Sequence, residues 1–242
     1  MTQQPLLEHL IELRQRLVRA LIGFFLVFVL LFHWSGTIYQ LLARPLLQHL
    51  PVGSHMIAIE VTAPFFVPMK VTMLVALLLS LPNTLYQIWA FIAPGLYQHE
   101  KQLILPLVVS SVSLFFIGMA FAYFLVFPLV FSFMAAVTPT GVSMMTDIDK
   151  YLSFVMSMFL AFGAAFEVPV VVVVLVRVGI LDIPKLRRAR PYMVVGAFVV
   201  AAVVTPPDVL SQTMLAVPLC LLYEAGILAS MLMERRRARK GS

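Results

Sequence analysis

The sequence has little charge and almost no cysteine. Only 12% of its 242 residues are charged, and Cys220 is the single cysteine. A disulfide framework, a CxxC redox pair and a cysteine-based metal site are therefore excluded. The five histidines share no ligand spacing, so we predict neither a metal nor any other cofactor. Because the chain also lacks a glycine-rich phosphate loop and the GxSxG and HExxH motifs, we predict that it is not an enzyme.

Hydrophobic residues are abundant instead. They make up 62% of the chain, whose mean hydropathy is +1.00. A soluble domain of this length could not bury so much apolar surface, so the composition predicts a multi-pass membrane protein. The isoelectric point near 9.7 does not indicate nucleic-acid binding, because the basic residues stand at the ends of apolar segments, where they fix orientation.

The apolar pattern predicts an all-α membrane protein that forms one domain over residues 1–242. Six spans are expected, at about residues 17–38, 69–92, 103–127, 151–176, 192–204 and 209–222. The last two are short, since thirteen helical residues cover roughly 20 Å of a hydrocarbon core about 30 Å thick. Residues 1–16 are expected to form a separate interfacial helix, residues 39–67 and 128–150 to form outer loops, and residues 234–242 to form a basic tail.

The distribution of lysine and arginine predicts the orientation. If both termini are cytoplasmic, inner segments carry fourteen of the 17 basic residues, and the outer loops keep only Arg44, Lys70 and Lys150. This asymmetry follows the positive-inside rule. We therefore predict a multi-pass membrane protein with cytoplasmic N- and C-termini.

Three carboxylates are predicted to lie near the cytoplasmic surface. Helical spacing places Glu8 and Glu12 on one face, and Glu100 lies in the polar stretch that follows Phe91-Ile-Ala-Pro94. Carboxylates beside an apolar wall suit a cationic ligand with an attached hydrophobic segment, and arginine binds a carboxylate bidentately. The alternative is that Glu12 forms an ordinary helical ion pair with Arg16, four residues on.

Polar groups also occur inside the predicted spans. Glu167 falls on a stripe of small and polar residues, with Pro169 two positions later, and Asn83 and Gln87 share one face of the second span. An intramembrane carboxyl is costly and predicts a functional role. The alternative is a neutral acid that is hydrogen-bonded within the bundle. At the start of the last span, Asp208 is expected to cap the helix.

Taken together, several motifs resemble the TatC family, the polytopic core of the twin-arginine protein translocase. They are His9-Leu-Ile-Glu-Leu-Arg14, Ser80-Leu-Pro82, Gln87-Ile-Trp89, Phe91-Ile-Ala-Pro-Gly-Leu-Tyr97 with Glu100, Phe166-Glu-Val-Pro169, Arg190-Pro191 and Thr205-Pro-Pro-Asp208-Val-Leu-Ser-Gln212. The resemblance covers about residues 7 to 232. One departure is that Lys101 is followed by Gln102, so the basic run after Glu100 is short.

The resemblance implies a glove-shaped six-helix receptor for the paired-arginine signal peptides of folded cargo proteins. It further implies assembly with the single-span partners TatB and TatA, self-association in a larger complex, and transport driven by the proton-motive force. By resemblance, Glu12, Arg14, Leu96 and Glu100 belong to the signal-binding site, while Glu167 lines the concave face within the membrane. Thr205 and Gln212 are implied in partner docking, and Pro45 and Pro82 in shaping the scaffold.

A small-solute transporter or proton channel that uses Glu167 as its relay is the rival prediction. Transporters of this kind carry internal repeats with interrupted spans at corresponding positions of the two halves. The six spans predicted here show no such repeat, and the two short spans are adjacent. The sequence therefore favours the receptor.

Overall fold

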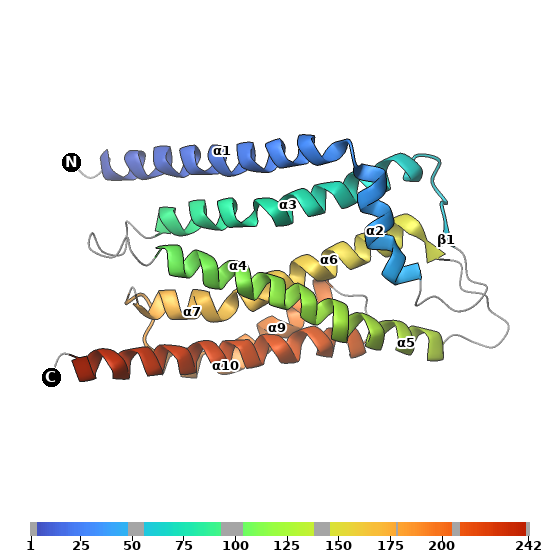
Figure 1. Cartoon of the computed structure of the whole chain (residues 1–242). Helices are drawn as coiled ribbons and strands as arrows, with labels where there is room; N and C mark the ends of the chain where they lie inside the picture. The colour runs from blue at the N-terminus through green and yellow to red at the C-terminus, as the bar shows by residue number, and fades with distance from the viewer. Residues whose placement is uncertain are drawn as a thin grey trace. The chain divides into compact units, whose positions relative to one another are not determined.

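The computed structural model describes residues 4–47, 56–92, 104–137, 146–177, 179–204 and 209–240. Helices make up nearly all of this part of the chain (Figure 1). Five helical segments are long and apolar enough to cross a bilayer, and a sixth is shorter: Leu10–Phe32, Ala63–Ile92, Leu105–Phe133, Ile148–Arg177, Val209–Glu234 and the short Arg190–Val203. The predicted all-α class is confirmed, and the number of apolar helices agrees roughly with the six spans predicted.

The helices belong to two compact units. The first contains Met1–Val112 and Gly141–Met156, and the second contains Ser113–Thr140 and Ser157–Ser242. The third and fourth apolar segments thus both begin in the first unit and end in the second. In each unit the described core is almost wholly apolar, with residues such as Val71 and Leu152 in the first and Phe162 and Leu215 in the second.

In the first unit, α1 (Gln4–Phe32) is one continuous helix. The prediction of a separate interfacial helix over residues 1–16 was wrong, because nothing in Arg14-Gln15-Arg16 interrupts helical hydrogen bonding. The span also ends earlier than Ile38. His33 and Trp34 form a turn in which the Trp34 amide donates to the Leu31 carbonyl oxygen at 2.9 Å.

The short helix α2 (Ser35–Leu47) follows this turn and crosses the end of α3 (Ala63–Ile92), which packs against it (Figure 1). We expected a loop here, because residues 39–67 are too mixed to span a membrane. A mixed composition is nevertheless compatible with a surface helix, which needs only one apolar side. Pro45 lies near the C-terminal end of α2.

Helix α3 runs without interruption through Pro68 and Pro82. Each proline removes one backbone donor, and neighbouring helices or hydroxyl groups compensate for such losses inside membranes. The Thr72 hydroxyl, for example, donates to the Pro68 carbonyl oxygen at 2.7 Å. The start of α3 is tied to the start of α6 (Ile148–Phe166) by an ion pair of 2.6 Å between Lys70 Nζ and Asp149 Oδ1.

Two very short strands lie on the same side of the first unit as this ion pair. Strand β1 (Met56–Ile57) pairs in parallel with β2 (Thr146–Asp147). Because β1 precedes α3 and β2 precedes α6, the strands and the Lys70–Asp149 pair join the same two segments. We predicted no strand, so these two short strands are an unexpected feature of the described residues.

The third span is longer than predicted. Helix α4 (Ile104–Phe121) continues through the π-helical segment η3 (Ala122–Val126) into α5 (Phe127–Val137). We predicted that the span ends at about Phe127 and that an outer loop covers residues 128–150. The π-helical turn shifts the hydrogen bonding by one residue, with the Phe127 amide donating to the Ala122 carbonyl oxygen. The helix thereby passes a proline that cannot donate.

The fourth span is broken at Glu167. Helix α6 (Ile148–Phe166) ends there and α7 (Val168–Arg177) begins. Pro169 has no amide hydrogen, so one regular helical hydrogen bond is missing at this point. Beyond α7, Gly179 adopts a positive φ of 78°, which glycine accepts without strain, and the chain turns into α8 (Ile183–Arg188).

The second unit closes with α9 (Arg190–Val204) and α10 (Val209–Lys240). The shortness of α9 is as predicted. Helix α10 continues past the predicted span 209–222, because Tyr223, Glu224 and the residues after them keep helical geometry and pack against α7 and α8. Tyr223 and Ile227 are buried there with Val172 and Leu186. The start at Val209 is as predicted, whereas the capping role of Asp208 lies outside the described residues.

Candidate functional site

Glu12 is presented by the continuous helix α1. Its side chain is half-buried and pairs with Arg16, one helical turn further on. Arg16 Nε donates at 2.9 Å and Nη2 at 2.6 Å, and both bonds end on the same carboxylate oxygen, Oε1. The helical ion pair that we considered as the alternative is therefore present. The second oxygen, Oε2, takes no part in it.

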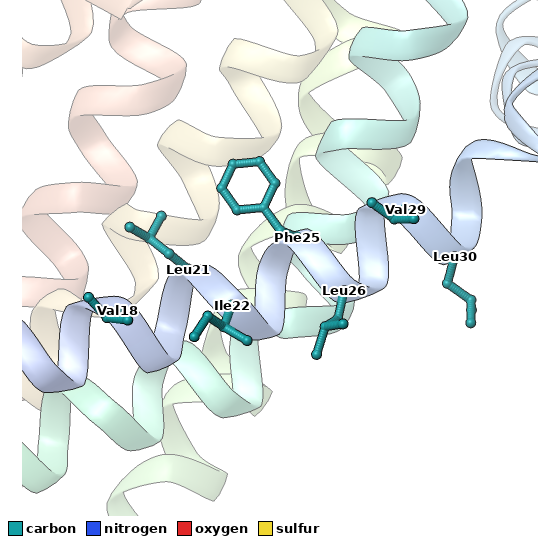
Figure 2. Close-up of a pocket in the computed structure, with 7 residues that line it drawn as sticks. All are labelled: Val18, Leu21, Ile22, Phe25, Leu26, Val29 and Leu30. Carbon is teal, nitrogen blue, oxygen red and sulfur yellow. The ribbon is translucent and has the colours of Figure 1, made fainter.

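The same helix carries a broad apolar surface beyond Glu12. Seven apolar side chains of α1, drawn in Figure 2, line a shallow hollow. Its volume is about 540 Å³. Only 6% of the apolar window of this helix is buried, because α1 packs mainly against α3 and turns its other sides outward. The hollow is lined by Val18, Leu21, Ile22, Phe25, Leu26, Val29 and Leu30.

The other residues predicted for the cytoplasmic site are only partly placed. Glu8 lies on α1, in the part for which only the backbone is described, one helical turn before Glu12. Arg14 is exposed on the same helix. Leu96 and Glu100 lie outside the described residues, together with Pro94. The structure therefore brings Glu8, Glu12 and Arg14 onto one rigid helix and does not test their proximity to Glu100.

Gln87 lies on α3 and is buried, with 9% of its surface exposed. Its Oε1 atom has no hydrogen-bond partner among the described residues. One turn earlier, Asn83 Nδ2 donates to the Arg19 carbonyl oxygen of α1 at 3.4 Å. The predicted polar face of this span thus points towards neighbouring helices. An unpaired buried amide oxygen is costly and marks Gln87 as a position where a polar group can be received.

Glu167 occupies the break between α6 and α7. Its amide donates to the Ala164 carbonyl oxygen at 3.1 Å, and its carbonyl accepts from Val171 at 3.0 Å. The side chain is half-buried, ten residues or about 15 Å before Arg177 at the end of α7. Along the predicted stripe, Ser157, Leu160 and Ala164 are exposed. These three residues therefore lie on the outer side of α6, whereas the two carboxylate oxygens of Glu167 are buried.

The remaining predicted residues fall in different places. Gln212 is half-buried on α10, next to the fully buried Ser211, whereas Thr205 lies outside the described residues. Pro82 is exposed on α3, and Phe91 is half-buried near the end of that helix. Trp89, the last residue of the Gln87-Ile-Trp89 motif, donates from Nε1 to Ser111 Oγ at 3.0 Å and ties α3 to α4.

Sequence reasoning missed one charged contact in the second unit. Arg190 Nη2 lies 2.6 Å from Glu224 Oε2 and connects the start of α9 to the middle of α10. The adjacent Tyr223 hydroxyl donates to the Leu186 carbonyl oxygen at 2.9 Å. The partners are 34 and 37 residues apart, so no local pattern could have paired them. The one available signal was a single acidic residue within an otherwise apolar segment.

Comparisons with known proteins agree with this arrangement. The family model "Sec-independent protein translocase protein (TatC)" matches residues 8–218. The chain is 56% identical over 223 residues to the Sec-independent protein translocase protein TatC of Azotobacter chroococcum, covering 92% of this chain and 88% of that protein. It is 55% identical over 227 residues to the protein of the same description from Escherichia coli K12, covering 94% and 88%.

A solved structure has the same fold. The crystal structure described as the twin-arginine translocase receptor TatC matches with a TM-score of 0.82 and 38% sequence identity, covering 93% of this chain and 98% of that one. These matches favour a translocase component over a small-solute transporter and over any enzyme. With its apolar spans, the chain is a multi-pass membrane protein that works within a multi-subunit translocase. The family match over residues 8–218 and these relatives together show that the chain belongs to the TatC family.

Proposed function

We propose that this protein is the receptor and core subunit of a twin-arginine translocase. It binds the paired-arginine signal peptides of folded cargo proteins and assembles with TatB-like and TatA-like single-span proteins for export driven by the proton-motive force. We further propose that it resides in the bacterial cytoplasmic membrane with both termini in the cytoplasm. The observation that carries the proposal is the half-buried Glu12 carboxylate on the helix that also carries the apolar hollow.

The chemistry of Glu12 suits an arginine ligand. Its pair with Arg16 is a helical ion pair that remains partly exposed, and such pairs contribute only about 0.3–0.5 kcal/mol. An incoming guanidinium can therefore use the second oxygen, Oε2, or displace Arg16 at little cost. Because a guanidinium presents a planar fork of donors, it can contact both carboxylate oxygens, whereas an ammonium group cannot. Glu100 is proposed to bind the second arginine of the pair.

The apolar part of a signal peptide needs an apolar surface next to these charges. On α1, Val18 begins the hollow six residues after Glu12, or about 9 Å along the helix axis. The charged and apolar surfaces stay in fixed register because the helix is unbroken. Within the membrane we propose a later contact with Glu167 and Gln87. Partner docking is proposed at Thr205 and Gln212, and self-association in a larger complex follows from the family.

The test measures the affinity of a fluorescent paired-arginine peptide for the purified full-length protein in nanodiscs. Glu12→Gln and Glu100→Gln remove the charge and keep the shape. Each is expected to weaken binding by about 2–5 kcal/mol, or at least about 30-fold, as when one partner of a desolvated charged pair is lost. A paired-lysine peptide should lose less, because it has no bidentate contact to lose.

Arg16→Gln is the matched variant. It removes the residue that competes for Glu12, so binding of the paired-arginine peptide should become about two-fold tighter. If Glu12→Gln and Glu100→Gln both leave the affinity unchanged, neither carboxylate reads the signal and the proposed recognition site is wrong.

A further inference from the structure

The outward side of α10 carries an apolar stripe that ends in basic residues. Val217, Leu221, Leu228 and Leu232 are all exposed, and their spacing places them on one side of the helix. The helix continues to Lys240 (Figure 1). At 100° per residue, its backbone places positions 235 and 239 on the same side, and the sequence has arginine at both.

Helix α8 supplies further positive charge beside the end of this stripe. Arg187 and Arg188 are exposed, and Arg187 Nη2 lies 3.1 Å from Met231 Sδ of α10. This contact brings α8 next to Leu232. We call Arg187, Arg188, Leu228, Leu232 and helix positions 235 and 239 the α10 lipid surface.

The acidic groups of the region are paired with other cations or turned away. Asp182 Oδ2 lies 2.9 Å from Lys185, and Glu224, which interrupts the stripe, is paired with Arg190. Glu234 is on a different side of α10, where it lines a cavity of about 50 Å³ with Arg177 and Ser230 of α7 and α10. The α10 lipid surface therefore keeps a positive character.

An apolar stripe that ends in cations is complementary to one class of ligand. An acidic soluble protein would pair with the cations but leave the apolar stripe uncovered. A wholly apolar helix would cover the stripe but leave the cations unpaired. A phospholipid with an anionic headgroup uses both, because its acyl chain lies along the helix and its phosphates meet the basic residues. We propose that the α10 lipid surface selectively binds an anionic phospholipid in the adjacent leaflet.

The test measures which lipid lies against Leu232. In a Cys220→Ala background, Leu232→Cys is labelled with a bimane fluorophore, and the full-length protein is placed in phosphatidylcholine vesicles. Traces of nitroxide-labelled phosphatidylglycerol or phosphatidylcholine then quench the fluorophore. Half-maximal quenching should need at least about five-fold less labelled phosphatidylglycerol than labelled phosphatidylcholine. The reason is that each cation near the membrane surface corresponds to roughly five-fold in affinity.

The control position is at the other end of the same helix. Val209→Cys is also exposed and should be quenched equally by the two lipids. In the Leu232→Cys protein, changing Arg187, Arg188, Arg235 and Arg239 together to Gln should abolish the preference, and changing all four to Lys should keep it. Equal quenching at position 232 in the protein with its arginines intact would overturn the proposal, as would a preference that survives the four Gln substitutions.

Discussion

At the scale of single residues, glycine decides where helices can approach closely. A Cβ atom added to Gly23 of α1 would lie 2.4 Å from Asn83 Nδ2 of α3. Real Cβ atoms do not come so close to an atom of another residue. The absence of a side chain lets the Asn83 amide reach the Arg19 carbonyl oxygen of α1. One polar contact between α1 and α3 therefore depends on a residue with no side chain.

We predict that Gly23→Ala lowers the stability of the protein by only about 0.5–1.5 kcal/mol, because the Asn83 amide can rotate away and what is lost is its hydrogen bond to Arg19. The measurement is the midpoint of unfolding in a denaturing-detergent titration. Gly36→Ala is the control, because a Cβ atom there meets nothing within 4 Å. The loss should shrink in an Asn83→Ala background, since the clashing amide is gone. Equal effects of Gly23→Ala with and without Asn83 would contradict this explanation.

A second residue-scale prediction concerns Glu167. Glu167→Ala should fold and still bind signal peptide, but it should fail in export, because this carboxyl lies within a span and the proposed recognition carboxylates lie near the surface. Glu167→Gln keeps the shape and a hydrogen-bonding amide, so it should retain much of the export. Signal-peptide crosslinking and cargo export are measured in the same cells. Lost crosslinking at normal protein levels would place Glu167 in initial recognition, and normal export would leave it a structural acid.

The candidate site could be predicted by residue type and only partly by geometry. Helical spacing correctly placed Glu8 and Glu12 on one helix and offered Arg16 as an alternative partner, because these are contacts within one turn. The Gln87 and Asn83 face was predicted for the same reason. Contacts such as Arg190–Glu224 depend on how distant helices pack, and a single sequence has no pattern that encodes such pairing.

At the scale of elements, α4 and α6 meet through two glycines in the second unit. A Cβ atom on Gly118 would lie 2.5 Å from the Phe162 carbonyl oxygen, and one on Gly163 would meet the ring of Phe115 at 2.5 Å. The ring of Phe121 lies 5.7 Å from those of both Phe162 and Phe166, measured between centroids. The small residues allow close backbone approach and the aromatic rings fill the space beside it.

Gly118→Ala should therefore destabilise the protein more than a Gly→Ala change at other glycines of the membrane-spanning helices. Its obstacle is a backbone oxygen, which cannot rotate away, so we expect a loss of about 1–3 kcal/mol. Gly196→Ala on α9 is the control, because a Cβ atom there is in open space. The unfolding midpoints of the two variants decide the matter, and equal midpoints would contradict it.

The fold was predictable where hydrophobic content alone determines structure. Long apolar runs placed the six segments approximately, but several of their ends were wrong. The third span continues past Pro128, as α3 passes Pro82, because in a membrane the cost of a missing donor is lower than that of ending a helix in hydrocarbon. Pro169, by contrast, does coincide with a break, beside the polar Glu167.

At the scale of the whole molecule, orientation in the membrane is the property to test. Val61, which precedes α3, is 97% exposed, and Ile180, between α7 and α8, is also exposed. In a Cys220→Ala background, a membrane-impermeant thiol reagent added outside intact cells should label Val61→Cys and spare Ile180→Cys. Permeabilised cells should show labelling at both positions. Labelling of position 180 in intact cells would reverse the proposed orientation.

The small buried fraction of α1 has a consequence for the synthesis of the protein. The ribosome completes α1 well before α3, and Asn83 is made sixty residues after Gly23. During this interval α1 must persist in lipid without its neighbour. Its apolar surface, of which so little is buried in the finished fold, makes this state inexpensive. We expect a chain that ends shortly after Phe32 to insert stably, whereas α9, with its short apolar length and its ion pair to α10, must wait for the last helix to be made.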